Sequence, residues 1–299
     1  MKKILITGGS GLIGNKLTSY LEKKGFKVAW LSRKPKKKKQ KSFGWDIKNQ
    51  TIDQKALNWC DAVIHLAGAG IADKRWTDER KKEILESRTL SARLLYQNIQ
   101  KCEQMPQTFI SASGVNYYGF NSGSNLLDEQ SSPGDDFLAE TVIKWEEEVL
   151  KIQTLGIRTV VLRTGAVLDK KEGALAKMMK PPIAAPLGSG NQYMSWIHIN
   201  DLAMMYIHAL THEGISGIYN AVAPHPVLNK TFTKIAAKEK GKPFVGIPVP
   251  SFVLKTVLGE MANIVTGGSK VSSAKIQESG FKFKFPFVEE ALQDIYKKR

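Results

Sequence analysis

Short apolar runs alternate along the first half of the chain with longer segments in which apolar residues recur every three or four positions. The short runs predict buried strands at 4–7, 27–32, 62–67, 108–113 and 159–163. The longer segments predict amphipathic helices, among them 77–101 and 136–154. Strands that alternate with helices in this way indicate an α/β fold with a parallel sheet and right-handed crossover connections.

The pattern loosens after residue 163, which predicts a smaller second part. Stretches rich in proline and glycine at 180–182 and 186–190 are typical of loops beyond the carboxyl ends of the strands. A mixed segment begins near residue 230 and leads to an apolar, helix-like stretch at 252–265. We expect a large domain over 1–229, with loop insertions from about residue 165. A small, partly helical C-terminal cap would occupy 230–299.

A glycine-rich turn joins the first predicted strand to the first predicted helix. Gly8 allows a tight turn, Gly11 allows backbone N–H groups to approach a pyrophosphate, and Gly14 allows the helix to pack closely on the strand. The helix N-terminus adds partial positive charge. An ordinary turn is the alternative, but the strand before it and the helix after it favour a dinucleotide site. The predicted cofactor contacts here are Gly8, Gly11, Leu12, Ile13 and Gly14.

The end of the second strand indicates which dinucleotide binds. A carboxylate there bonds the ribose 2′-hydroxyl, whereas a cation accepts a 2′-phosphate. The chain has Ser32, Arg33 and Lys34 at this point and no acidic residue. The planar guanidinium of Arg33 can hold a phosphate through paired hydrogen bonds, so NADP is favoured over NAD. For the lysines that follow, a role in surface solubility is the alternative.

Further cofactor contacts are expected from later segments. Asp46 could accept a hydrogen bond from the adenine amino group. Glu83 and Arg88 lie on the helix after the third predicted strand and could reach the cofactor, with solvated helix charges as the alternative. His65 is predicted to be a structural histidine. The residues that bring backbone close to the middle of the cofactor are Leu66, Ala67 and Gly68.

The net charge of the 299 residues is +16 at pH 7, and much of it lies in the lysine-rich segment 34–41. A solvated basic loop, a funnel for an anionic ligand and a nucleic-acid site are the alternatives. No aromatic residue is interleaved with these lysines, so nucleic acid is disfavoured and an anionic small molecule is the expected partner. The role of the segment stays open.

Other compositional features exclude several classes of protein. The sequence has no apolar stretch of membrane-spanning length, and its N-terminus does not resemble a signal peptide. We therefore expect a cytoplasmic protein with no membrane partner. Its cysteines, Cys60 and Cys102, predict neither a disulfide framework nor a metal site.

Several segments carry a family resemblance together, at 7–14, 65–68, 111–119, 162–165 and 195–202. In order and spacing they resemble the extended short-chain dehydrogenase/reductases, or NAD-dependent epimerase/dehydratase superfamily. The tail from 258 to 292 is similar to the small C-terminal domain of its atypical branch, described as epimerase family proteins or sugar-nucleotide epimerase-like. This resemblance implies a Rossmann-type doubly wound sheet, an NAD(P) site that includes Ser111, and a substrate cleft under the C-terminal part. Arg163 would bind a cofactor or substrate anion, or cap the sheet, and a homodimer is compatible with the family.

Typical members of that family use a Tyr-x-x-x-Lys pair, in which the lysine lowers the pKa of the catalytic tyrosine. Alignment of the helix at 136–154 places Phe137 and Thr141 at these two positions, and neither side chain can do this chemistry. The nearest replacement is the segment that ends the fourth strand. There Ser113 could hold a substrate oxygen while Tyr117 or Tyr118 acts as acid and base, or one of these tyrosines contacts the substrate or nicotinamide.

The segment around residues 192–202 offers the remaining candidates. Gln192, Tyr193 and Trp196 mix polar and aromatic groups beside a glycine-rich loop and are predicted to contact substrate. His198 is predicted to orient its loop through Asp201. The expected activity is hydride transfer between NADP and an unidentified small molecule, with a nucleotide sugar as one candidate substrate. The alternative is a regulatory NADP-binding protein with reduced catalysis.

Overall fold

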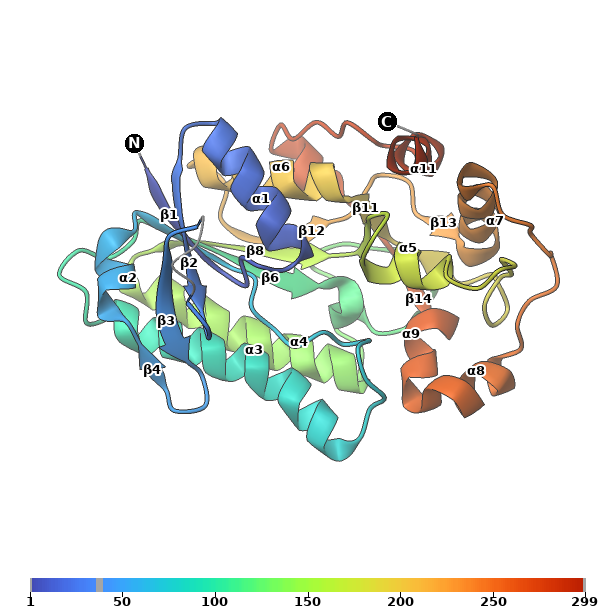
Figure 1. The fold of residues 1–299 in the computed structure, drawn as a ribbon, viewed down its shortest axis with the longest axis horizontal. Helices are drawn as coiled ribbons and strands as arrows, with labels where there is room; N and C mark the ends of the chain where they lie inside the picture. The colour runs from blue at the N-terminus through green and yellow to red at the C-terminus, as the bar shows by residue number, and fades with distance from the viewer. Residues whose placement is uncertain (1, 36–39, 298–299) are drawn as a thin grey trace.

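The computed structural model describes residues 2–35 and 40–297, so the predictions for lysines 36–39 lie outside the described residues. An eight-stranded sheet runs through its centre in the order β12-β8-β6-β5-β1-β2-β3-β4 (Figure 1). Adjacent strands of this sheet run parallel, except that β3 and β4 are antiparallel to each other. The predicted strands are present as β1 (Lys3–Thr7), β2 (Lys27–Ser32), β5 (Ala62–His65), β6 (Thr108–Gly114) and β8 (Arg158–Thr164). The predicted α/β fold with a doubly wound parallel sheet is therefore confirmed.

The strand order reverses between β1 and β5. From β1 the chain passes outward through β2 and β3, and then crosses back to place β5 on the other side of β1. Connections that leave in opposite directions open a crevice at the carboxyl ends of the two strands. The order of the sheet therefore fixes where a ligand cleft lies.

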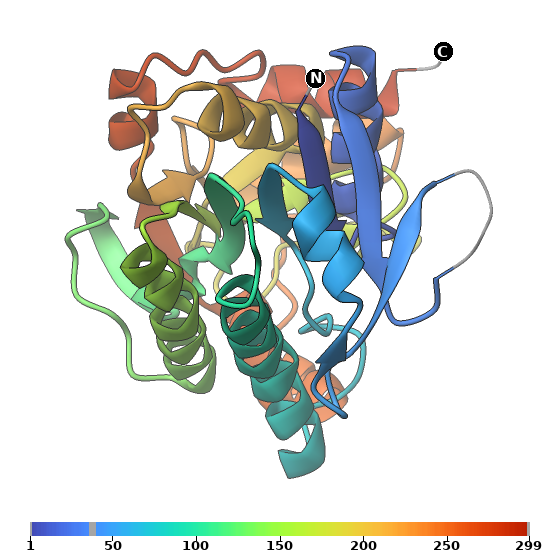
Figure 2. The ribbon, with the colours of Figure 1, turned by 90° about the vertical axis from the view of Figure 1, so that its left-hand side faces the viewer.

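Helices cover both faces of the sheet (Figures 1 and 2). α1 (Leu12–Lys23) and α6 (Ile199–Thr211) lie on one face; α3 (Asp78–Ile99) and α4 (Phe137–Leu150) lie on the other. Alternate side chains of β1 face opposite cores, since Ile4 and Ile6 pack with α1 and α6, and Leu5 packs with α3 and α4. Burial on both faces explains why the strands are continuous apolar runs.

The sequence pattern did not predict some of the elements. They are β3 (Ser42–Asp46), β4 (Thr51–Ile52), α2 (Gln54–Trp59) and β12 (Gly217–Ala221). β3 and β4 form one edge of the sheet and are only partly buried. β12 forms the other edge, where Ala221 is buried. Edge strands lack the continuous apolar run that identifies central ones.

The second half of the chain adds small sheets and short helices. Its paired strands are β7 (Asn121–Leu127) with β14 (Gly268–Val271), β9 (Ala166–Leu168) with β11 (Trp196–His198), and β10 (Tyr193–Met194) with β13 (Val227–Leu228). The helices are α5 (Gly173–Met178), α7 (Asn229–Lys240), α8 (Ser251–Leu258), α9 (Asn263–Thr266), α10 (Ala274–Glu278) and α11 (Val288–Tyr296). The 3-10 helices are η1 (Val115–Tyr118), η2 (Lys151–Leu155) and η3 (Gly259–Ala262). The helix-like stretch at 252–265 is thus broken at Gly259, which has a φ of +62°.

Residues on both sides of the predicted boundary at 230 share one core. Leu168 and Trp196 pack in the same cluster as Phe232 and Leu292. The Asp201 carboxylate accepts hydrogen bonds from the backbone N–H groups of residues 284 and 285, at 3.0 and 2.9 Å. The division into 1–229 and 230–299 stays a prediction, and these contacts show that the two parts are fastened together.

Candidate cofactor cleft and active site

A buried chain of hydrogen bonds holds the ends of β1 and β5. The Thr7 hydroxyl lies 2.8 Å from His65 Nδ1, and it accepts hydrogen bonds from the backbone N–H groups of Leu66 and Ala67 at 3.0 and 3.1 Å. The other ring nitrogen of His65 lies 3.2 Å from the Ser91 hydroxyl on α3. Burial lowers the pKa of His65 to about 3, so the ring is neutral and can accept one bond and donate the other. His65 therefore shapes the cleft from beneath, in agreement with its predicted structural role.

The glycine turn between β1 and α1 is as tight as the sequence predicts. Gly8 has a φ of +67°, and a Cβ there would lie 2.9 Å from the Leu66 carbonyl carbon. A Cβ on Gly14 would overlap the Gly8 carbonyl oxygen, whereas a Cβ on Gly11 would meet only that oxygen, at 3.4 Å. Gly8 and Gly14 thus allow close backbone packing, and exposed Gly11 leaves room above the turn.

A cleft of about 1000 Å³ opens above this turn, at the reversal point of the strand order. Predicted residues on its wall are Gly8, Gly11, Ser32, Arg33, Lys34, Leu66, Ala67, Gly68 and Glu83. Leu12, Ile13 and Gly14 lie just beyond the wall, in the first turn of α1, where Ile13 packs against the core. Arg33 and Lys34 are exposed at the end of β2, and none of the wall residues that the structure describes at this end is acidic.

Sequence reasoning missed part of this wall. These residues are Gly9, Ser10, Trp30, Leu31, Gln40, Ser42, Trp45, Ile47, Ala69, Gly70, Asp73, Arg80 and Ser87. The Trp30 ring packs directly on Gly9, since a Cβ on Gly9 would overlap the ring. Arg80, Glu83 and Ser87 recur at helical spacing, so the period of α3 could have predicted that they share one face.

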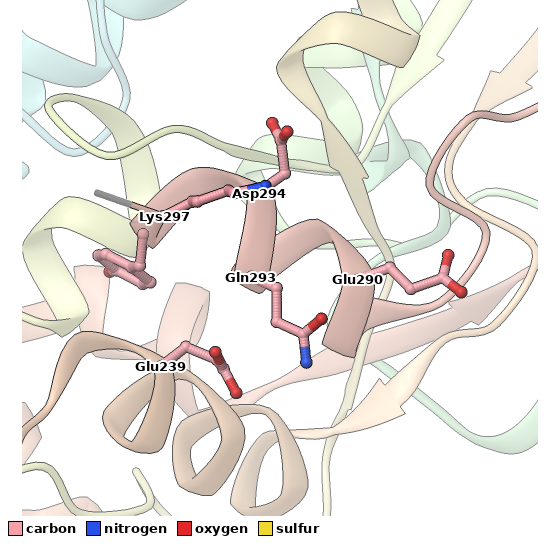
Figure 3. Close-up of a pocket in the computed structure, with 6 residues that line it drawn as sticks. Glu239, Glu290, Gln293, Asp294 and Lys297 are labelled. Carbon is pink, nitrogen blue, oxygen red and sulfur yellow. The ribbon is translucent and has the colours of Figure 1, made fainter. Parts of the chain in front are cut away.

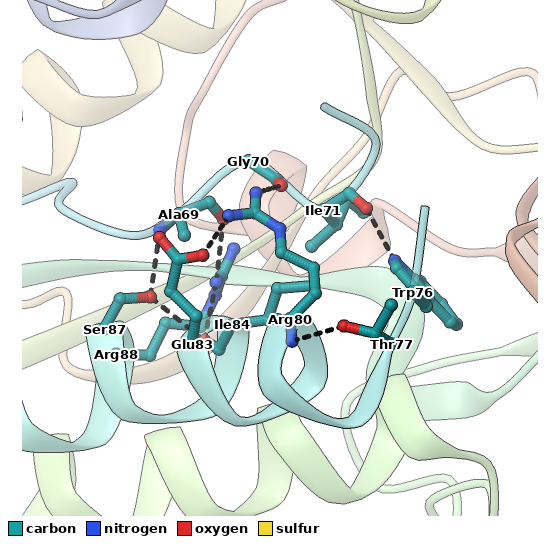
Figure 4. Close-up of polar contacts among 10 residues, drawn as sticks. All are labelled: Ala69, Gly70, Ile71, Trp76, Thr77, Arg80, Glu83, Ile84, Ser87 and Arg88. Carbon is teal, nitrogen blue, oxygen red and sulfur yellow. Dashed lines mark hydrogen bonds and ion pairs between the residues drawn. The ribbon is translucent and has the colours of Figure 1, made fainter. Parts of the chain in front are cut away.

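Two arginines on α3 hold the loop after β5 (Figure 4). Arg80 donates to the Gly70 carbonyl oxygen and pairs with Glu83 Oε2, each at 2.5 Å, while its buried Nε has no hydrogen-bond partner among the described residues. Arg88 donates to the carbonyl oxygens of Ala69 and Ile84 at 3.0 and 2.9 Å. Burial lowers the pKa of Arg88 to about 10, with a smaller contribution from the like charge of Arg80. The sequence predicted a cofactor contact for Arg88, but its side chain supports the loop from below and does not line the cleft.

The sequence predicted that Asp46 contacts adenine, but its carboxylate forms hydrogen bonds within its own turn. Its carboxylate accepts hydrogen bonds from the backbone N–H groups of Lys48 and Asn49 and from the Asn49 side chain, at 2.8–3.1 Å. These bonds, led by the one from the Asn49 backbone, lower the pKa of Asp46. Ile47 lies on the cleft wall in its place. Asp46 closes the turn between β3 and β4, a common use of aspartate.

A buried ionic network occupies the ends of β6 and β8. Arg163 and Glu146 are 2% and 4% exposed and form two hydrogen bonds with each other, at 2.9 and 2.7 Å. The Ser113 hydroxyl donates to Glu146 Oε1 at 2.5 Å. Arg163 is enclosed with Glu146, which fits its alternative role of capping the sheet and opposes the predicted contact with an external anion. The predicted bond from Ser113 to a substrate oxygen needs correction, because its proton is donated to Glu146. Ser111 is also fully buried, and its hydroxyl donates to the Ala112 carbonyl oxygen.

The two candidate tyrosines lie in different environments. Tyr118 is buried, donates to Asn220 Oδ1 at 2.8 Å and accepts from Arg163 at 3.1 Å. Burial raises the pKa of Tyr118 to about 12, so it stays protonated and the role of a base does not suit it. Tyr117 is half-buried, with the Arg163 guanidinium 3.3 Å from its ring centroid. Within the described ranges its hydroxyl has no hydrogen-bond partner.

The positions of the usual tyrosine and lysine are filled by an apolar cluster. The Phe137 ring packs edge-on against the Trp76 ring, with 5.1 Å between the ring centroids, and joins a cluster with Leu138 and Met261. Thr141 is buried, and its hydroxyl donates to the Phe137 carbonyl oxygen at 2.8 Å. Neither side chain provides a proton or a charge to the cleft.

The predicted substrate residues are mostly structural. Trp196 is fully buried, and its indole N–H donates to the His225 carbonyl oxygen at 3.0 Å, which is at odds with a substrate contact. The Gln192 side-chain amide donates to two backbone carbonyl oxygens, at 2.8 and 2.7 Å. Tyr193 is half-buried beneath the Lys270 ammonium. His198 caps α6 by accepting from the Asn200 backbone N–H at 3.1 Å, and burial lowers its pKa to about 4.

A second cavity, of about 610 Å³, lies between α7 and α11 (Figure 3). Its wall is Glu239, Glu290, Gln293, Asp294, Tyr296 and Lys297. Figure 3 shows the labelled side chains of α11 pointing in different directions.

In the part of the chain that the structure describes, no His, Cys, Asp and Glu side chains group as metal ligands, and no helix has the length and apolarity to cross a membrane.

The glycine turn, the cleft at the strand reversal and the order of the sheet agree with a family model described as "NAD dependent epimerase/dehydratase family", which matches residues 4–221. The chain belongs to this family. A second model, a domain of unknown function named DUF1731, matches residues 249–295. These matches confirm the resemblance found in the sequence.

Individual relatives match over the whole length. The chain is 37% identical to epimerase family protein YfhF of Bacillus subtilis, over 98% of this chain and 97% of the relative. The crystal structure of human epimerase family protein SDR39U1 with NADPH superposes with a TM-score of 0.88 at 34% identity, over 99% of this chain and 100% of that one. A nucleoside-diphosphate sugar epimerase from Corynebacterium glutamicum gives a TM-score of 0.79 at 30% identity, over 100% of this chain but 59% of that one.

Proposed function

We propose that this member of the family binds NADP(H) and uses it for hydride transfer on a small molecule, as a reductase or an epimerase-like enzyme. The observation that carries the proposal is the basic end of the cleft, where Ser32, Arg33 and Lys34 form the wall at the end of β2. A 2′-phosphate needs cations at this point, and a ribose 2′-hydroxyl needs a carboxylate. The NADPH in the human relative supports the same choice.

The cleft also fits the rest of the dinucleotide. The overlap that a Cβ on Gly14 would make shows that the turn is built for close backbone packing, and Gly11 leaves the space above it open. The turn leads into the N-terminus of α1, whose N–H groups favour a pyrophosphate. Glu83 and Ser87 lie on the wall and offer a carboxylate and a hydroxyl for ribose hydroxyls.

Titration with NADPH and NADH, followed by tryptophan fluorescence or calorimetry, tests this assignment. Trp30 and Trp45 lie on the cleft wall and can report occupancy. Arg33→Ala should weaken NADPH binding by about tenfold or more, since a hydrogen bond to a charged group contributes about 1.5–3 kcal/mol, and should leave NADH binding unchanged. Lys55→Ala, an exposed lysine on α2, is the matched control. Equal affinities for both cofactors in every variant would contradict the assignment.

We assign the proton that the substrate oxygen gains or loses during hydride transfer to a group of this chain. When bound, the nicotinamide supplies or accepts a hydride, and the substrate oxygen must gain or lose a proton at the same time. Tyr117 is the candidate because its hydroxyl lacks a partner among the described residues while Arg163 holds its ring. The substrate stays open, and the name of the Corynebacterium relative supports a nucleotide sugar as one candidate.

A panel of carbonyl compounds and nucleotide sugars would identify turnover. Tyr117→Phe should lower kcat by about a hundredfold or more without changing NADPH affinity, since general acid–base catalysis contributes roughly 10²–10⁴-fold. Steady NADPH consumption indicates a reductase, and conversion without net consumption indicates an epimerase. The second candidate function is a regulatory NADP-binding protein, which Phe137 and Thr141 favour. Tight NADPH binding without turnover on any substrate would support it.

A further inference from the structure

Exposed apolar side chains gather around α8, and none of them belongs to the wall of the cofactor cleft. We call this set the apolar patch, and its members are Ile183, Val245, Ile247, Phe252, Val253 and Val257. Ile247, Phe252 and Val257 are 76%, 71% and 69% exposed. Soluble surfaces scatter such side chains singly, so a cluster marks an interaction site.

Backbone contacts make the patch continuous. The Val245 N–H donates to the Ala184 carbonyl oxygen at 2.9 Å, which places Ile183 beside the segment that leads into α8. The Val249 N–H donates to the Pro186 carbonyl oxygen at 2.8 Å and extends this pairing towards α8. In Figure 1, this segment and α8 form an outer edge of the molecule.

Within the patch, α8 packs on the rest of the chain through one side only, where partly buried Leu258 meets the cluster that contains Met261. None of its residues is buried. Val253 and Val257 lie at positions i and i+4, which share one face of a helix, and Phe252 lies on the adjoining side, one position before Val253. An apolar helix face of this kind is normally covered by a neighbouring element. Here it faces the outside of the chain.

The lysines on the same segments are not neutralised. They are Lys180, Lys238, Lys240, Lys242 and Lys255, and none forms an ion pair with a described carboxylate. Lys240 and Lys242 instead donate to the Met179 carbonyl oxygen, at 2.7 and 2.9 Å. Burial, with the like charges of Lys242 and Lys170, lowers the pKa of Lys240. Lys240 and Lys242 are thus held by backbone oxygens, whereas exposed Lys180 and Lys255 place positive charge on the segments of the patch itself.

We propose that the apolar patch docks the protein on the surface of an anionic phospholipid bilayer. Phe252, Val257 and Ile247 would enter the interface, and exposed Lys180 and Lys255 would contact the phosphate headgroups. A second copy of the chain is a poorer match, because pairing of the patch with itself would bring like-charged lysines together. An acidic peptide fits a groove better than a projecting edge. Surface docking needs no spanning helix, so it revises the expectation of no membrane partner, which rested on spanning length.

Flotation with phosphatidylcholine vesicles, with and without phosphatidylglycerol, tests the proposal. The protein should float with the anionic vesicles and not with the neutral ones. The double variant Phe252→Ser and Val257→Ser should bind at least about tenfold more weakly, since both side chains leave the interface. Lys255→Glu should weaken binding by about fivefold or more, and high salt should weaken it further.

Matched controls separate docking from nonspecific attraction. Leu126→Ser removes an exposed side chain outside the patch, and Lys55→Glu makes the same charge change on α2. Both should float like the unchanged protein, and every variant should keep its NADPH affinity, which shows that it is folded. Equal flotation with neutral vesicles, an equal loss in the control variants, or no flotation would overturn the proposal. A concentration-dependent dimer abolished by the double variant, without vesicle binding, would assign the patch to a second copy instead.

Discussion

The end of β2 and the ends of β6 and β8 are built on opposite principles. At the end of β2 the wall is open and basic, with Arg33 and Lys34 exposed to an incoming ligand. At the ends of β6 and β8, Arg163 is enclosed with Glu146, and Phe137 stands in an apolar cluster. The open end thus leaves its cations available to a charged ligand, whereas the enclosed end pairs its own charges. Membership of a widely used fold therefore does not fix what each end does, and the function has to be argued from the residues at each end.

The largest expected effect comes from opening the enclosed pair. Glu146→Ala leaves the Arg163 guanidinium buried without its carboxylate, which should cost about 3–5 kcal/mol of unfolding free energy in urea titrations. Glu147→Ala, an exposed neighbour on α4, should change it by no more than about 0.5 kcal/mol. If both variants unfold at the same urea concentration, the pair does not hold the catalytic end together.

At the open end, the glycine turn is the most sensitive point. Gly14→Ala places a Cβ against the Gly8 carbonyl oxygen, and overpacking of this kind costs about 1–3 kcal/mol. Because the displaced backbone forms the cradle, NADPH affinity should fall by roughly ten- to a hundredfold in calorimetric titrations. Gly25→Ala is the control: its φ of +84° makes alanine strained, but no atom lies within 4 Å of the added Cβ. It should lower stability without changing NADPH affinity.

The neutral His65 between the two ends predicts a pH dependence of stability. Its folded pKa of about 3 lies below the ordinary histidine pKa of 6.5, so the unfolded chain binds the proton more tightly. The stabilisation is complete above pH 6.5 and declines as the pH falls towards 3. Between pH 7 and pH 5 the loss should be about 2 kcal/mol in urea titrations. His198 adds a loss in the same direction, since its pKa is lowered to about 4.

The variant His65→Gln sharpens this prediction, because it removes the titration of His65 and keeps that of His198. Its unfolding free energy should depend less steeply on pH between 7 and 5 than that of the unchanged protein. His225→Gln, which replaces an exposed histidine, should leave the slope unchanged. Identical slopes in all three proteins would show that His65 is not held neutral.

The sequence predicted the open end better than the enclosed one, for a physical reason. Strand runs and glycine spacing are local signals, and they placed Gly8, Arg33 and Leu66 around one cleft. The direction in which Arg163 and Trp196 point depends on helices and loops distant in sequence, so their burial was not predictable from their motifs. Arg80 was missed because its reach to Gly70 depends on where α3 begins, at the cap formed by Thr77.

The smallest expected effect tests whether the enclosed end has kept any trace of the usual catalytic geometry. Phe137→Tyr restores the family's hydroxyl, but Thr141 provides no charge at the usual lysine position. The ring packs between Trp76 and the Lys81 ammonium, whose charge is paired with Glu260. Turnover of any substrate found in the panel should therefore stay within about twofold, far below the roughly 10²–10⁴-fold that a working acid–base group contributes. Tyr117→Phe, assayed beside it, should show the large loss. A rise of about a hundredfold in Phe137→Tyr would mean that the position still faces the reacting atoms, and that the role proposed for Tyr117 is wrong.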